Sequence, residues 1–85
     1  MSNVAEITSD LALSQILVLE KNVTHKGGKL SFIHKFMFVI KKDDEHSYVK
    51  MNLYDKEYYL FSKKHPTQIF STFDELVLWV ENNIL

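Results

Sequence analysis

Three turn signals divide the middle of the chain into segments of strand length, and they constrain the fold more than any other feature. Gly27-Gly28, Asp43-Asp44 and Asp55-Lys56 each stand between segments rich in apolar residues. Residue pairs of this kind favour two-residue hairpin loops, because they tolerate positive φ. The segment 15–62 is therefore predicted to form an antiparallel meander of four strands, and a short fifth strand is expected at 68–70.

The register set by these turns places one group of apolar residues on the same side of the sheet. The first turn pairs Leu17 with Phe38, and the second pairs Phe38 with Val49. The third pairs Met51 with Leu60. The inner face predicted in this way comprises Leu17, Leu19, Val23, Phe32, Phe36, Phe38, Val49, Met51, Leu53, Tyr58 and Leu60.

A helix at 72–84 supplies the cover for that face. Thr72 and Glu75 have the spacing of a capping box. The apolar residues that recur at helical period are Phe73, Leu76, Val77, Val80 and Ile84. The predicted fold is thus α+β, a four- to five-stranded antiparallel meander with one C-terminal helix packed on one face. Residues 1–85 form a single domain, in which 1–14 are an N-terminal arm or a short helix.

The outer face of the predicted sheet keeps more apolar residues than a solvated face normally shows. The run 36–40 is apolar on both sides, although a sheet with one wet side alternates apolar and polar residues. A contiguous exposed apolar area beyond a few hundred Å² usually marks an interface. The candidate partner-binding residues are Ile33, Met37, Val39, Tyr48, Tyr59 and Phe61 on this face, with Leu78 and Trp79 as a second patch on the helix.

Three arrangements would bury the outer face. The N-terminal segment could fold over it, a second copy of the chain could pack against it as a homodimer, or a different protein could dock on it. The sequence leaves all three open.

Composition excludes several classes of protein. The net charge of −1 gives no overall field that attracts nucleic acid. The absence of cysteine excludes disulfides and thiolate sites and fits a cytoplasmic location. All ten basic residues other than histidine are lysine. The chain therefore lacks arginine, whose guanidinium group binds phosphate in a bidentate manner. No secretory signal and no membrane span are expected.

The sequence carries no catalytic, metal or cofactor signature. None of the four histidines stands at ligand spacing from another histidine, and no phosphate-binding loop opens a helix. Hence neither an enzyme, a small-molecule substrate nor a cofactor is expected. Lysines alternate with aromatic residues around Tyr59, and a sheet of this kind can hold single-stranded nucleic acid. Nucleic-acid binding is therefore the alternative function.

The order of the predicted strands and the closing helix resembles that of an SH2 domain. The resemblance is carried by 28–32, 48–60 and 68–77. An SH2 domain would place its phosphotyrosine-binding arginine near Leu19, and this chain contains no arginine. Phosphotyrosine binding is therefore not implied, and we interpret the resemblance as convergence on a common sheet-plus-helix plan.

The function expected from these observations is a small non-catalytic protein–protein interaction module. The lysine-only basic residues and the abundance of Asn, Ile, Phe and Tyr resemble the composition of chains from AT-rich genomes. A phage or mobile-element accessory protein that inhibits a host factor would suit this composition and size.

Overall fold

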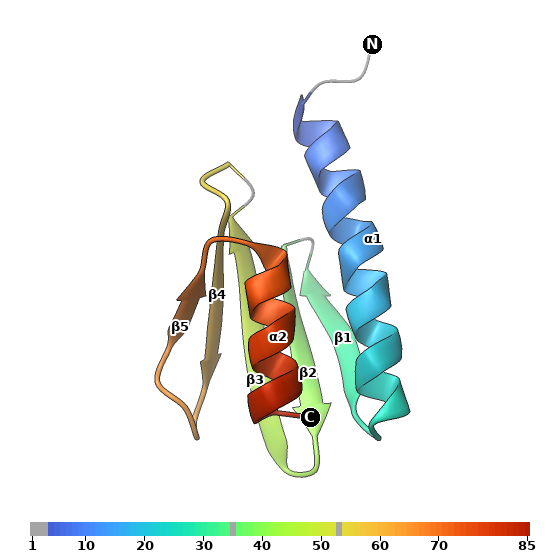
Figure 1. The fold of residues 1–85 in the computed structure, drawn as a ribbon, viewed down its shortest axis with the longest axis vertical. Coiled ribbons are helices and arrows are strands. Elements are labelled where there is room, and N and C mark those ends of the chain that lie inside the picture. Colours follow the sequence, from blue (N-terminus) through green and yellow to red (C-terminus); the bar gives the residue numbers. More distant parts are fainter. Residues whose placement is uncertain (1–3, 35, 53) are drawn as a thin grey trace.

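The computed structural model describes the backbone of residues 4–34, 36–52 and 54–85, with side chains from Leu13 onward. Within these residues the fold is α+β, with two helices and a five-stranded antiparallel sheet (Figure 1). The elements are α1 (Val4–His25), β1 (Lys29–His34), β2 (Met37–Lys42), β3 (Glu45–Asn52), β4 (Glu57–Ser62), β5 (Gln68–Phe70) and α2 (Phe73–Asn83).

The sheet is a simple meander in which each strand pairs with the next along the chain. Lys42 pairs with Glu45, which confirms the two-residue turn at Asp43-Asp44. Asp43 has a φ of 55°, the positive value that such a turn requires. The predicted pairing of Phe38 with Val49 is also confirmed.

The third turn is two residues longer than predicted, because Glu57 pairs with Asn52 rather than with Tyr54. Met51 pairs with Tyr58 rather than with Leu60, so that register prediction is wrong by two residues. The side chain of Asn52 explains the difference, because it holds Asp55 inside the longer turn. Its Nδ2 donates a hydrogen bond to Asp55 Oδ2 at 2.9 Å, and its Oδ1 accepts one from the backbone N–H of Asp55 at 3.3 Å. A shift of two residues leaves every side chain on its predicted face. Leu53, assigned to the inner face, lies outside the described residues.

The first predicted strand is wrong, because 15–25 belong to α1. Gly27-Gly28 ends this helix instead of turning a hairpin. Gly27 N–H donates to Thr24 O at 3.0 Å and Gly28 N–H donates to Val23 O at 2.9 Å. These are the two hydrogen bonds of a Schellman motif, in which Gly27 takes the left-handed position with a φ of 87°.

Helix α1 contributes a stripe of buried residues to the core. Ile16, Leu19 and Val23 are buried at a spacing of three and four residues, which is the helical period. Leu17 was predicted to share the inner face with Leu19, but it is 49% exposed and Leu19 is 1% exposed. Leu19 also lies on a helix rather than on the strand that the SH2-like order requires, so that resemblance ends here.

Helix α2 confirms the predicted C-terminal helix. The Thr72 hydroxyl accepts a hydrogen bond from Glu75 N–H at 3.2 Å, and the Glu75 carboxylate accepts one from Ser71 N–H at 3.4 Å. Phe73, Leu76 and Val80 are buried. Each such side chain contributes roughly 1.5–3 kcal/mol to stability before entropy is subtracted.

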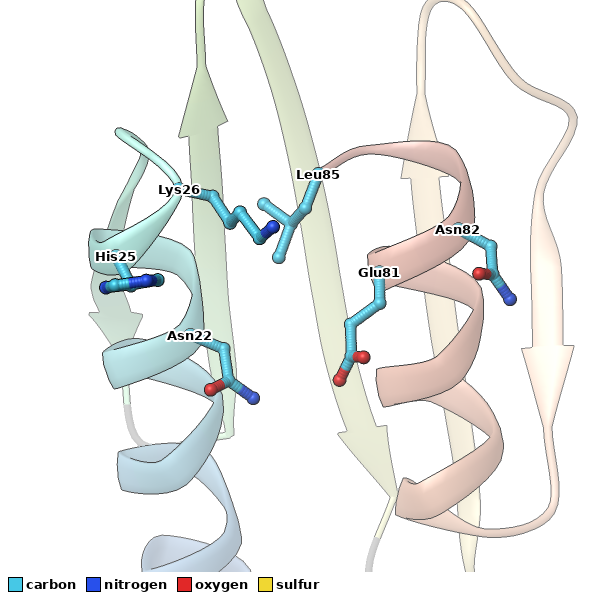
Figure 2. A pocket seen from close by; sticks show the side chains of 6 residues that line it. All are labelled: Asn22, His25, Lys26, Glu81, Asn82 and Leu85. Carbon is cyan, nitrogen blue, oxygen red and sulfur yellow. The ribbon is translucent and has the colours of Figure 1, made fainter.

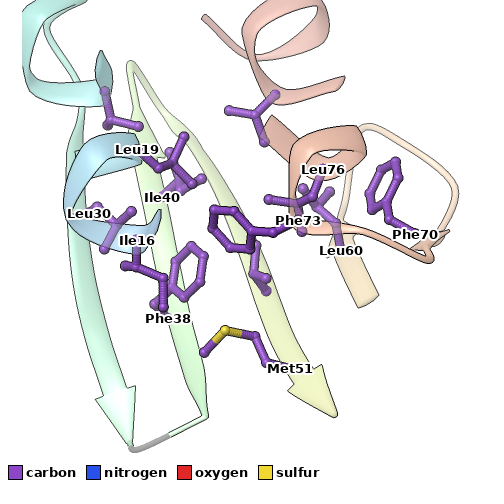
Figure 3. Packing of buried hydrophobic residues seen from close by; sticks show 13 residues of the cluster. Ile16, Leu19, Leu30, Phe38, Ile40, Met51, Leu60, Phe70, Phe73 and Leu76 are labelled. Atoms are coloured by element: carbon purple, nitrogen blue, oxygen red, sulfur yellow. The ribbon is translucent and has the colours of Figure 1, made fainter. Parts of the chain in front are cut away.

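Both helices pack on the same face of the sheet (Figure 1). Their apolar stripes meet strand residues such as Phe38, Ile40 and Leu60 in one continuous core (Figure 3). Phe32 lies at the margin of this core, edge to face with Phe38, and remains about half exposed. Within the described chain, neither helix has the length and apolar character needed to cross a membrane.

Candidate functional site

The face of the sheet that points away from both helices is the candidate site, and we call it the open face. Among the described residues, α1 joins the core on the opposite side through Ile16, Leu19 and Val23. The alternative in which the N-terminal segment folds over the outer face is therefore contradicted by the position of α1 (Figure 1).

Strand register arranges the open face in three rows that run across the strands. The lysine row pairs Lys29 with Lys41 and Lys41 with His46. The two neighbouring rows contain most of the apolar side chains. The aromatic row consists of Ser31, Val39, Tyr48 and Phe61, and the mixed row consists of Met37, Lys50, Tyr59 and Ile69.

The aromatic row is packed although neither helix of the described chain lies over it. Val39 is only 6% exposed, yet it does not belong to the core between sheet and helices. The Tyr48 and Phe61 rings stack with centroids 6.4 Å apart and planes 18° apart. Val39 pairs directly with Tyr48, and Tyr48 pairs with Phe61 on the next strand. The row is therefore a preformed apolar platform.

A hollow of about 620 Å³ adjoins one end of this platform. Tyr48 and Phe61 supply its aromatic wall, and Lys63 and Lys64 lie where β4 ends. The other residues that line it are Asp44, Glu45, His46 and Ser62. The hollow combines aromatic surface with charge, as the border of a protein-binding surface does.

Tyr59 in the mixed row is tied to its own strand. Its hydroxyl donates a hydrogen bond to the carboxylate of Glu57. This hydrogen bond, with smaller contributions from burial and from the negative charges of Glu57 and Asp55, raises the pKa of Tyr59. Burial alone raises the pKa of Tyr58, which faces the helices. Tyr59 is therefore neutral at physiological pH and held in one orientation.

The predicted site residues separate into two groups. Met37, Val39, Tyr48, Tyr59 and Phe61 lie together on the open face, as their shared register requires. Ile33 lies at a bulge between β1 and β2, at the edge of the sheet, and is about half exposed.

The second predicted patch lies on α2, away from the open face. Trp79 is half-buried, with its ring 6.2 Å from that of Phe70 and 5.1 Å from that of His65. Leu78 is 61% exposed. The flanking exposed residues Glu75 and Glu81 are acidic, so Leu78 stands as a single apolar side chain rather than as part of a patch.

Two features of the open face are missing from the sequence prediction. Ile69 pairs with Tyr59 and is 63% exposed at the end of the mixed row. The alternation of the expected strand at 68–70 is the signal that could have found it. The lysine row depends on the pairing of β1 with β2. The sequence prediction placed a hairpin at Gly27-Gly28, so it paired Lys29 with the preceding segment and did not place it opposite Lys41.

A polar cluster of Glu45 and His65 holds the β4–β5 connection in place. Glu45 Oε1 lies 3.4 Å from His65 Nε2, and the His65 ring packs edge to face on Trp79. Ser47 is fully buried nearby on β3, and its hydroxyl has no hydrogen-bond partner among the described residues. A substrate cannot reach a hydroxyl that is fully buried, so we assign this cluster a structural role.

A second hollow of about 320 Å³ separates the C-terminal ends of α1 and α2. Figure 2 shows Asn22, His25 and Lys26 on one side and Glu81, Asn82 and Leu85 on the other. Among the described residues that line it, His25 is the histidine and Glu81 carries the one side-chain carboxylate. In the described part of the chain, no three His, Asp or Glu side chains gather in a way that could hold a metal ion.

Comparison with known proteins identifies no family. No family model, curated protein or solved structure matches this chain. The open face is therefore interpreted from its own geometry and chemistry.

Proposed function

We propose that this chain is a non-catalytic module that binds another protein through the open face of its sheet. The observation that carries the proposal is the placement of both helices on one side, which leaves the aromatic and mixed rows without a covering element in the described chain. Burying such rows against a partner is favourable, because apolar surface leaves water.

The residue types on the open face support a protein partner. Tyrosine, phenylalanine and methionine are enriched at the centres of protein interfaces, and the borders are polar. Tyr48 and Phe61 lie in the aromatic row, and Met37 lies in the mixed row. Because the Tyr48 and Phe61 rings already pack on each other, little side-chain freedom is lost when a partner binds.

Two substitutions of equally exposed residues test the proposal. Ile69 on the open face and Leu78 on α2 are 63% and 61% exposed, so a change to serine at either position should alter stability little. Affinity purification from native cells should recover the same partner with the unchanged chain and with Leu78→Ser, and should lose it with Ile69→Ser. Equal recovery with both variants, or loss with Leu78→Ser alone, would contradict the proposal.

Single-stranded nucleic acid is the second candidate, and one observation favours it. The lysine row runs parallel to the aromatic row, so phosphates could lie along one row while bases stack on the other. Binding of this kind weakens steeply with added salt. Titration of oligo(dT) at two salt concentrations tests it, and no binding at low salt would exclude it.

The further assignments from composition stay predictions. A phage or mobile-element inhibitor of a host factor would use a docking surface of this kind, and a cytoplasmic location would suit it. Identification of the partner by mass spectrometry in the purification above tests both.

A further inference from the structure

The lysine row places like charges directly opposite one another. Lys29 faces Lys41 across β1 and β2. Like charges in directly opposed cross-strand positions destabilise a sheet. The row therefore weakens the isolated chain, and a partner that brings negative charge would relieve the repulsion.

The lysines of the open face also lack internal compensation. Among the described residues, the lysines that form ion pairs are Lys42 and Lys64. Lys29, Lys41 and Lys50 are exposed and form none within that part of the chain.

Helix α2, which lies on the side of the sheet away from the open face, carries acidic residues. Helix α2 contains Asp74, Glu75 and Glu81 and no lysine. On the open face, Glu57 accepts the hydrogen bond from Tyr59, and Asp44 lies at the end of the hollow. Lys21 and Lys26 also lie on the helix side, so charges of both signs occur there. The open face is distinguished by lysines that form no ion pair in the described chain, not by its total charge.

We infer that the open face binds an acidic protein surface, one with an apolar centre bordered by aspartate or glutamate. This inference rests on the proposed function and names the chemistry of its partner. Complementary charge speeds encounter and selects the partner, and burial of the aromatic row supplies most of the affinity.

The open face suits an acidic partner better than a second copy. A second copy would bring its own uncompensated lysines to the same interface. A face of five strands, spaced about 4.8 Å apart and about 20 Å long, offers on the order of 400 Å². A standard interface buries about 800 Å² on each partner, so the open face alone suits a transient complex better than a stable one, whichever protein it binds.

Nucleic acid fits the open face less well. Met37, Val39 and Ile69 are aliphatic members of its central rows and offer no ring on which a base could stack. No arginine is present to bind a phosphate through two hydrogen bonds. An acidic protein surface needs only the lysines that the face contains.

Three synthetic peptides of equal length test the inference. They share alternating apolar residues and differ only in whether the polar positions are glutamate, glutamine or lysine. We expect the glutamate peptide to bind most tightly to the full chain and to perturb the NMR signals of the open face. The double variant Lys29→Gln/Lys41→Gln should weaken its binding roughly two- to thirtyfold, the range expected for the loss of two exposed charge pairs.

Matched controls separate charge on the open face from charge in general. Lys21→Gln/Lys26→Gln removes two exposed lysines on the helix side, and it should leave the affinity nearly unchanged. The charge-reversed variant Lys29→Glu/Lys41→Glu should prefer the lysine peptide to the glutamate peptide. Such an inversion would directly support the inference.

The other outcomes overturn the inference, and they separate it from the proposed function. Equal affinity for the glutamate and glutamine peptides, or no peptide binding at all, removes the acidic partner and leaves the comparison of Ile69→Ser with Leu78→Ser to decide the proposed function. Tighter binding of oligo(dT) than of the glutamate peptide rejects both in favour of nucleic acid. Sedimentation that shows a dimer assembled through the open face overturns the acidic partner in favour of a second copy.

Discussion

The assignment of 15–25 to a helix can be tested by two substitutions two residues apart. On a strand, Leu17 and Leu19 would point to the same face, and their replacement by alanine would cost similar amounts of stability. On α1 they lie about 200° apart around the helix axis. Leu19 is accordingly 1% exposed, and Leu17 is 49% exposed.

The magnitudes follow from this burial. Leu19→Ala removes a fully buried side chain from the core and should cost about 2–5 kcal/mol. Leu17→Ala removes a side chain that is already half in water, so its cost should be about 1 kcal/mol. A chain of this length has a free energy of unfolding on the order of 4–13 kcal/mol, so Leu19→Ala approaches the lower bound of that range.

Urea denaturation followed by circular dichroism measures both variants. We expect the midpoint of Leu19→Ala to fall several times further than that of Leu17→Ala. Ile16→Val serves as a milder probe of the same stripe, with an expected cost of about 0.5–1.5 kcal/mol. Equal losses for Leu17→Ala and Leu19→Ala would refute the helical assignment and restore a strand.

Three further predictions concern single residues. Gly28→Ala should cost about 1–3 kcal/mol in thermal unfolding, because a Cβ there would lie 3.0 Å from the backbone carbonyl of Lys41; an unchanged midpoint would contradict that packing. Lys41→Gln should raise the free energy of unfolding by about 0.2–1 kcal/mol through relief of the repulsion with Lys29, and a loss of stability would show that the two side chains do not oppose each other. Glu57→Gln should lower the pKa of Tyr59 in an ultraviolet titration, since the carboxylate holds it above its usual value. Because that pKa is raised in the folded state, the stability that Tyr59 contributes is present below the unfolded-state pKa of about 10 and is lost as pH rises through the folded pKa.

Elements encoded by nearby residues could be predicted from the sequence. The turn at Asp43-Asp44 and the cap formed by Thr72 and Glu75 each depend on contacts within four residues. The apolar residues of α2 recur with the helical period, and they do not show the alternation of a strand. These local signals were sufficient to predict the β2–β3 register and the C-terminal helix correctly.

The N-terminal helix could not be predicted because its sequence fits two periods. The run Ile16-Leu17-Val18-Leu19 is apolar at every position, so it satisfies a buried strand and one turn of a helix equally. Gly27-Gly28 is likewise compatible with a hairpin and with a helix C-cap, since both need positive φ. Only packing against the sheet distinguishes the two, and that information is not local.

The sequence predicted which residues share the open face, but it did not predict what covers that face. The strands that carry the site have a regular alternation of side chains between the two faces. This alternation places Met37, Val39, Tyr48, Tyr59 and Phe61 on one face. Whether the N-terminal segment covers that face could not be predicted, because this depends on the side of the sheet on which α1 packs.

The most direct test of the account is photo-crosslinking from two matched positions. Benzoylphenylalanine placed at Ile69 or at Leu78 occupies sites of nearly equal exposure on opposite sides of the molecule. We predict that irradiation in native cells yields one discrete protein adduct from position 69 and none from position 78. An adduct from position 78 alone would contradict the assignment of the open face as the docking surface.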